Sequence, residues 1–262
     1  MRSEHKFEMK SRARNIALLV SYDGTNYEGF QRQSNGRAVQ NVLERKLQKI
    51  FGDTIELAAS GRTDSGVHAR GQVVNFFTDG RIPIEKIPVA VNSILPPDIV
   101  IRSAVEADRE FSARHSVVSK IYSYSIYQKP VADPFLNRYA LHVKYELDFE
   151  LMQTALKILE GTHDFSTFRS ATNVEMSPIR NMISAEMKKC MDSVFKFELH
   201  ATGFLYHMAR NIIGTILKVG RHEIPIEQFR EKFNARDHSI APWIAPANGL
   251  CLEKVFYDRE LF

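Results

Sequence analysis

The chain carries the sequence GRTDSGVHARGQ at residues 61–72. Two strand-like runs flank this stretch, TIELAA at 54–59 before it and QVVNFF at 72–77 at its end. Both runs contain β-branched or aromatic residues, which favour strands. The three glycines of the stretch permit positive φ angles and let another molecule approach the backbone closely. We therefore expect a tight loop between two strands that presents one carboxylate, Asp64.

The rest of the chain predicts further elements of both kinds. Strands are expected at 15–22, 120–127, 183–189, 194–200 and 250–257, and helices at 39–51, 84–94, 148–160, 204–219 and 225–233. The order predicts an α+β protein with two similar α/β subdomains, at 15–110 and 111–262. The two subdomains are expected to share a largely antiparallel sheet, with a positively charged cleft between them.

Composition narrows the class of protein. The chain has 262 residues, of which 44% are hydrophobic and 25% are charged, as in ordinary globular proteins. The net charge is +4 and the pI is about 9.0. This mild basic excess fits a polyanionic partner but does not establish one.

The cysteines and the N-terminus bear on location. Cys190 and Cys251 form no CxxC motif, so neither a zinc ribbon nor a disulfide framework is indicated. Residues 1–14 mix charges without an apolar core, and we expect them to form a flexible tail rather than a signal peptide. No apolar run approaches the roughly 20 residues of a membrane span. The sequence therefore predicts a soluble, cytoplasmic protein without a membrane partner.

Asp64 has three possible interpretations. An aspartate in a glycine-containing loop is often only a turn former that bonds its own backbone. A metal site shared with His68 is disfavoured, because no third ligand lies nearby in the sequence. Arg62 and His68 accompany Asp64 in the same loop, and a simple turn does not need this chemistry. We therefore treat Asp64 as a candidate catalytic residue.

Two tyrosines lie on a predicted strand. Tyr122 and Tyr124 share one face, because side chains alternate along a strand. They are either core residues or a platform beside Lys120 on which a flipped base could stack. Alternation alone does not select one of the two tyrosines. A loop at 29–33 (GFQRQ) likewise has two interpretations, an ordinary exposed loop or a contact with an RNA backbone.

The predicted helix at 204–219 is apolar on nearly all sides but contains Arg210. A buried arginine without a counter-charge is costly, so Arg210 needs a carboxylate or a phosphate. Asp64 is our candidate for that group, and the pairing would keep its carboxylate ionised.

The stretch GRTDSGVHA resembles the signature of the TruA family of tRNA pseudouridine synthases. Further segments resemble the same family, in the same order and from residue 21 to residue 250. They are SYDGT (21–25), GFQ (29–31), FSAR (111–114), DF (164–165), FLYHMARNIIG (204–214) and APANGL (245–250).

The resemblance implies a role for four residues. Asp64 corresponds to the catalytic aspartate and Tyr122 to the tyrosine that stacks on the target base. Arg210 corresponds to the arginine that pairs with the aspartate, and Arg62 to the arginine that helps to displace the base.

The resemblance also implies the pseudouridine synthase fold and a reaction. Family members isomerise uridine to pseudouridine in the anticodon stem-loop of tRNA, typically at positions 38 to 40, and work as homodimers. The aspartate acts either as nucleophile or as the base that starts an elimination. No cofactor and no metal are expected, and the chain has neither a dinucleotide-binding fingerprint nor a P-loop. Two rival hypotheses are a non-catalytic RNA-binding α+β protein and a hydrolase, although the sequence offers no second acid or base for the latter.

Overall fold

The computed structural model describes residues 12–33, 36–170, 177–241 and 243–262. The chain forms two compact units, Met1–Val118 with Leu252–Phe262, and Ser119–Cys251. The first compact unit ends at Val118 before the chain enters the second. The boundary between subdomains that the sequence suggested, at residue 110, stays a prediction. A flexible tail was expected at residues 1–14. Residues 1–11 of it lie outside the described residues, and the first strand begins at Arg14.

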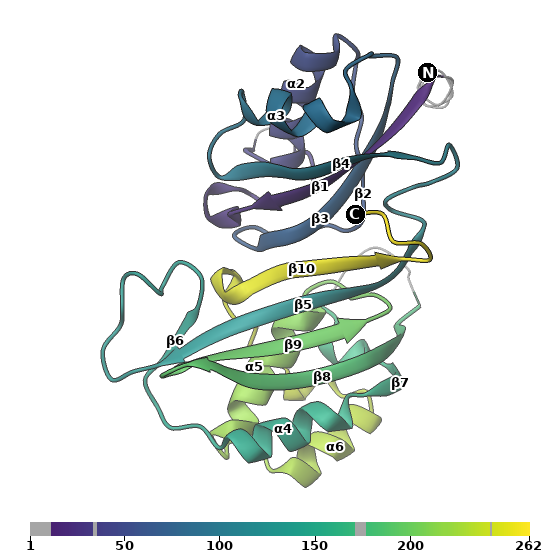
Figure 1. Cartoon of the computed structure of the whole chain (residues 1–262). Helices are drawn as coiled ribbons and strands as arrows, with labels where there is room; N and C mark the ends of the chain where they lie inside the picture. Colours follow the sequence, from purple (N-terminus) through teal and green to yellow (C-terminus); the bar gives the residue numbers. More distant parts are fainter. Residues whose placement is uncertain (1–11, 34–35, 171–176, 242) are drawn as a thin grey trace. The chain divides into compact units, whose positions relative to one another are not determined.

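The first unit is a small sheet covered by two helices. Its strands follow the order β4-β1-β3-β10, β2 also pairs with β3, and β1 runs antiparallel to both of its neighbours. The helices α2 and α3 lie side by side over this sheet (Figure 1). The elements are β1 (Arg14–Tyr22), α2 (Val39–Phe51), β2 (Ala58–Ala59), β3 (His68–Thr78), α3 (Ile87–Asn92), β4 (Ile99–Ala107) and β10 (Leu250–Tyr257).

Helix α2 shows how directly some elements follow from local sequence. Its apolar residues recur at helical spacing, and Leu43 and Leu47 are fully buried. Gly52 ends the helix in the left-handed conformation, with φ +75°, and its N–H donates to the carbonyl oxygen of Gln48 at 2.9 Å. The predicted bounds of this helix, 39–51, are confirmed.

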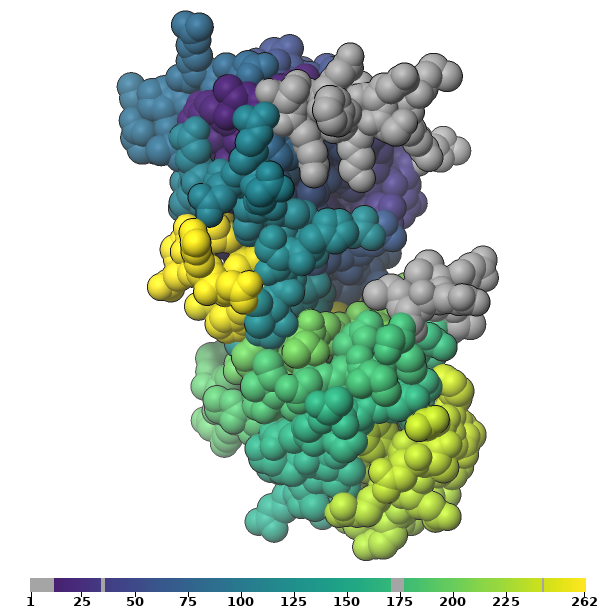
Figure 2. All heavy atoms as spheres, turned by 90° about the vertical axis from the view of Figure 1, so that its right-hand side faces the viewer, coloured from purple at the N-terminus to yellow at the C-terminus, as the bar shows by residue number. Residues whose placement is uncertain are grey.

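The second unit also combines one sheet with packed helices. Its strands follow the order β5-β9-β8-β7 with antiparallel pairing, and β6 pairs with β5 in parallel. Helix α4 packs on α5, α6 and β8, and Figure 2 shows α4 and α6 at the surface of this unit. The elements are β5 (Val117–Gln128), β6 (Leu141–Val143), α4 (Phe149–Ile158), β7 (Gly161–Asp164), β8 (Ile179–Met191), β9 (Val194–Ala201), α5 (Met208–Gly220) and α6 (Ile226–Asn234).

The predicted α+β class with a largely antiparallel sheet is confirmed, whereas several element bounds were wrong. The strand expected at 54–59 is reduced to β2, and β3 starts at His68 instead of Gln72 because Ala69 already pairs with Tyr22 of β1. Helix α5 starts at Met208 instead of Phe204, because His207 takes a left-handed conformation with φ +61°. The strands β4, β6 and β7 were not predicted. The cleft expected between the two halves stays a prediction.

The glycines of residues 61–72 meet the expectation of positive φ and close approach only in part. Only Gly66 has a positive φ, +77°. Gly71 lies within β3, and a Cβ there would come within 2.3 Å of the carbonyl oxygen of Glu253 in β10. The absence of a side chain at Gly71 therefore lets strand β10 of the same unit pack closely against β3.

Among the described residues, no helix combines the length and the apolar character needed to cross a membrane.

Candidate active site

Asp64 lies in the connection between β2 and β3 of the first unit. The residues after it form a tight turn at Ser65 and Gly66, and the N–H of Val67 donates to the carbonyl oxygen of Asp64 at 3.1 Å. Asp64 is half-buried, whereas Arg62 is exposed. The loop therefore combines a partly shielded carboxylate with an arginine that is open to solvent.

Main-chain hydrogen bonds hold the loop on both sides of Asp64. The N–H of Phe30 donates to the carbonyl oxygen of Thr63 at 3.0 Å, and the N–H of Gly66 donates to the carbonyl oxygen of Tyr27 at 3.2 Å. The hydroxyls of Tyr22 and Thr63 are 2.7 Å apart, and both residues are buried. Because these bonds involve buried backbone, the position of Asp64 is set by the segment 22–30 as well as by its own loop.

Two glycines of the segment 22–30 make this contact possible. Gly29 has φ +93°, and a Cβ on it would lie 2.8 Å from the carbonyl oxygen of Thr63. A Cβ on Gly24 would lie 2.0 Å from the carbonyl oxygen of Val67. Any side chain at either position would push the Asp64 loop away from its support.

Phe30 corrects our interpretation of the loop at 29–33. It is 1% exposed, and its ring lies 6.1 Å from that of Tyr22. Arg32 pairs with Glu44 of α2 at 2.8 Å. Both earlier interpretations, an ordinary exposed loop and a contact with an RNA backbone, are wrong for Phe30, because it is a core residue next to the Asp64 loop. The sequence carried no signal for this, because one aromatic in a polar run does not reveal its direction.

His68 anchors the far end of the loop. It is the first residue of β3 and is 6% exposed. Its Nδ1 accepts a hydrogen bond from the N–H of Gly24 at 3.1 Å and lies 3.1 Å from Oδ1 of Asp23. Asp23 also accepts hydrogen bonds from the backbone N–H and the hydroxyl of Thr25. His68 therefore joins the Asp64 loop to the turn that follows β1.

Ser60 and Gln72 fix the start of the loop, and the sequence analysis missed both. Gln72 is fully buried, and its Nε2 donates to the carbonyl oxygen of Gly61 at 3.0 Å. The hydroxyl of Ser60 donates to Oε1 of the same amide at 2.5 Å. A buried glutamine with both ends bonded restrains the backbone to which it is bonded. Its signal in the sequence was its place at the end of the stretch 61–72.

In the second unit, β5 carries the two tyrosines. Tyr124 is 1% exposed, its hydroxyl donates to the carbonyl oxygen of Pro246 at 2.8 Å, and burial raises its pKa. Tyr122 is 7% exposed, and its ring meets that of Phe204 edge-on at 4.9 Å. These contacts make Tyr124 a core residue. Tyr122 is buried as well, and its role in base stacking stays a prediction.

Arg210 lies on α5, which is buried almost throughout, and is itself half-buried. Its Nε donates to the carbonyl oxygen of Ala245 at 2.7 Å, and the N–H of Ala245 donates to the carbonyl oxygen of Arg210 at 3.2 Å. The segment around Ala245 thus holds the base of the guanidinium in place. The charge of Arg210 also acts on the hydroxyl of Tyr124, where it opposes the rise in pKa.

The structure therefore gathers the site residues in two groups. Asp64, Arg62 and His68 belong to one loop and strand of the first unit, and Tyr122 and Arg210 belong to the second unit. The pairing of Asp64 with Arg210 stays a prediction.

Many enzymes are α+β proteins that hold a carboxylate on a fixed loop. Comparison with known proteins identifies the family within this class. The sequence profile of the tRNA pseudouridine synthase family matches residues 18–116 and 155–258. The chain belongs to this family.

Curated relatives match over nearly the whole chain. The tRNA pseudouridine synthase A of Acetivibrio thermocellus is 40% identical over 93% of this chain and 100% of its own length. That of Bacillus pumilus is 42% identical over 93% of this chain and 99% of its own length. An archaeal box H/ACA sRNP Nop10-Cbf5 complex matches with a TM-score of 0.37 and 11% identity, over 82% of this chain and 46% of that chain.

Proposed function

We propose that this chain isomerises uridine to pseudouridine in the anticodon stem-loop of tRNA, at positions 38 to 40, with Asp64 as the catalytic residue. The isomerisation of uridine in tRNA follows from membership in the family. The observation that carries the role of Asp64 is its place on a loop braced from both sides by main-chain hydrogen bonds. A reacting group held in a fixed geometry before the substrate arrives lowers the barrier to reaction.

The reaction moves one bond of the nucleoside. The bond between N1 of uracil and C1′ of ribose breaks, the base turns, and C5 of uracil bonds to C1′. The proton on C5 leaves, and N1 gains one. Asp64 serves either as the nucleophile at C1′ or as the base that removes a ribose proton to form a glycal. Both routes need an ionised carboxylate, which Arg210 supports in this proposal.

The other residues act on the base. The target nucleotide must leave the helical stack, at a cost on the order of a few kcal/mol. Tyr122, whose ring is oriented by Phe204, supplies a stacking surface for the extruded uracil. Arg62 is exposed on the Asp64 loop and displaces the base from the stem. Binding is dominated by phosphate contacts and is therefore sensitive to salt.

The test combines activity with binding. We expect Asp64→Asn to reduce pseudouridine formation in a tRNA transcript by at least about a thousandfold, while the Kd for tRNA changes less than about tenfold. Release of tritium from 5-tritiated uridine measures the rate, and chemical mapping of pseudouridine locates the modified positions. Substantial turnover by the variant refutes the role of Asp64. Wild-type protein that binds tRNA but forms no pseudouridine supports the RNA-binding hypothesis instead.

Location and assembly complete the proposal. A tRNA substrate places the enzyme in the cytoplasm, and the family resemblance implies a homodimer. Light scattering coupled to gel filtration measures the mass in solution, and a mass of about 30.0 kDa, that of one chain, contradicts the dimer.

A further inference from the structure

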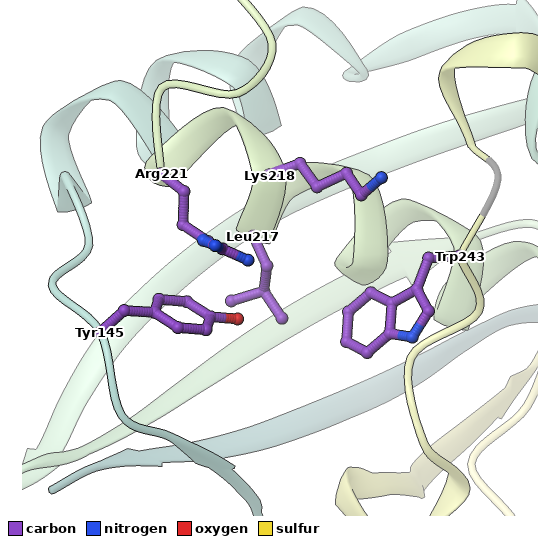
Figure 3. Close-up of a pocket in the computed structure, with 5 residues that line it drawn as sticks. All are labelled: Tyr145, Leu217, Lys218, Arg221 and Trp243. Atoms are coloured by element: carbon purple, nitrogen blue, oxygen red, sulfur yellow. The ribbon is translucent and has the colours of Figure 1, made fainter. Parts of the chain in front are cut away.

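A pocket outside the proposed catalytic residues lies in the second unit. Its volume is about 310 Å³, near the lower end of the range for small-molecule pockets. Figure 3 shows Tyr145 and Trp243 on opposite sides of Leu217, with Lys218 on the helix and Arg221 just beyond its end. The lining residues are Tyr145, Leu217, Lys218, Arg221 and Trp243.

The end of α5 forms the floor and one edge of the pocket. Leu217 is 1% exposed, and Lys218 lies next to it in the last turn. Gly214 lets the segment of Trp243 pack against this helix, since a Cβ at Gly214 would lie 2.3 Å from the carbonyl oxygen of Trp243. The backbone of Trp243 is therefore packed against α5, while the residue as a whole stays 38% exposed.

Arg221 is already arranged for contact with a planar group. Its guanidinium carbon lies 4.0 Å from the centre of the Tyr145 ring, in a cation–π contact. One of its nitrogens pairs with Glu223 at 2.7 Å, and its side chain remains 40% exposed. Tyr145 thus supports the guanidinium from one side, and Glu223 is its ion-pair partner.

Lys218 supplies a second cation at the same place. Among the described residues, it takes part in no ion pair within 4.0 Å. The carbonyl groups at the end of α5 would repel an anion, but those of Leu217 and Lys218 accept hydrogen bonds from the N–H groups of Arg221 and Glu223. An anion at the rim therefore meets the ammonium of Lys218, the guanidinium that Arg221 shares with Glu223, and carbonyl groups that already accept hydrogen bonds.

We propose that this pocket is an auxiliary RNA subsite that holds one unpaired nucleotide of the tRNA substrate. The base stacks on the indole of Trp243 and covers Leu217, and the adjoining phosphate lies against Lys218 and Arg221. This inference rests on the proposed function, because it takes tRNA as the ligand. An aromatic ring beside two cations suits a nucleotide, which has a planar base and a negative charge next to one another.

The chain contains one tryptophan, so its fluorescence reports on this pocket alone. We expect addition of a tRNA transcript to the full-length protein to quench the emission of Trp243 in a saturable manner that weakens as salt rises. We also expect ultraviolet cross-linking of tRNA that contains 4-thiouridine to label the peptides of Tyr145 or Trp243. Cross-links confined to other peptides overturn the proposal.

A matched pair of double variants isolates the contribution of the pocket. Replacing Lys218 and Arg221 by glutamine should raise the Kd for tRNA about tenfold and leave kcat at saturating tRNA unchanged. The control replaces Lys157 on α4 and Arg230 on α6, which also removes two positive charges from this unit, and should raise the Kd less than about twofold. Equal effects of the two double variants overturn the proposal.

The outcomes separate this inference from the proposed function. Pseudouridine formation without any change in Trp243 emission refutes the subsite and leaves the enzyme activity intact. Quenching and cross-linking by tRNA without pseudouridine formation support the subsite and refute the activity.

Discussion

The N–H of Phe30 donates a 3.0 Å hydrogen bond to the carbonyl oxygen of Thr63, the residue just before Asp64. Phe30 is itself buried, so this bond ties the candidate catalytic loop to the core of the first unit. Gly29, one residue earlier, faces the same oxygen with no room for a side chain. The position of the carboxylate thus depends on a contact distant in sequence.

Gly29→Ala should destabilise the protein by about 2 to 4 kcal/mol, because it adds a steric conflict with Thr63 to the strain of a positive φ. It should also lower kcat for pseudouridine formation at least about tenfold, since a small displacement of a reacting group is costly. Gly52→Ala is the control, because Gly52 also has a positive φ but a Cβ there has open space. It should cost only about 1 to 2 kcal/mol and leave kcat unchanged. Urea unfolding measures the stability and initial rates measure kcat. Equal losses of stability and kcat in the two variants contradict the role of Gly29 in supporting the Asp64 loop.

Tyr22→Phe removes the hydroxyl that lies 2.7 Å from that of Thr63. We expect a loss of about 1 kcal/mol in stability and a several-fold drop in kcat, with little change in the Kd for tRNA. Tyr127→Phe removes a buried hydroxyl that bonds Asn137 in the other unit, and serves as the control. It should cost similar stability without lowering kcat. If both variants keep full activity, the hydroxyl of Tyr22 does not position the loop.

Arg210→Met should both inactivate and destabilise the enzyme. The variant loses the hydrogen bond from Nε to Ala245, which is worth about 1.5 to 3 kcal/mol for a charged donor. It also removes the cation that supports Asp64 in the proposed function. Arg210→Lys keeps the charge but not the planar fork, and should restore part of the stability and little of the rate. Wild-type activity in Arg210→Met refutes the pairing.

Lys120 on β5 gives a pH-dependent prediction. Burial, together with the nearby charge of Arg180, lowers the pKa of Lys120 from 10.5 to about 8. The folded state therefore carries the cost of a buried cation below pH 8, and between about pH 8 and 10.5 the unfolded chain binds the extra proton. Stability from this residue must rise with pH across that window.

Replacing Lys120 by methionine removes this cost. Lys120→Met should be more stable than the wild type by about 1 to 3 kcal/mol near neutral pH, and the difference should shrink at about pH 9.5. Urea unfolding of both proteins at the two pH values provides the measurement. A difference that stays constant or grows with pH contradicts the lowered pKa.

The sequence predicted those elements whose cause is local. Helix α2 follows from the spacing of its apolar residues and from the stop at Gly52, and β10 matches its predicted bounds. The missed strand β4 (IVIRSAVEA) lacks clean alternation, so its pairing with β1 was needed to identify it. The start of α5 was misplaced because no residue type announces the left-handed conformation of His207.

By itself, the sequence determined the α+β class and the family, because both follow from local patterns and from motifs spread along the chain. The residues assigned to the chemistry stay predictions. Tertiary structure alone decided that Phe30 is core, that Gln72 restrains the start of the Asp64 loop, and that Tyr124 is committed to packing. The physical reason is that burial and hydrogen bonding between distant segments depend on which surfaces meet. The residue type limits the contacts that a side chain can make, and the packing of distant segments decides which of these contacts form.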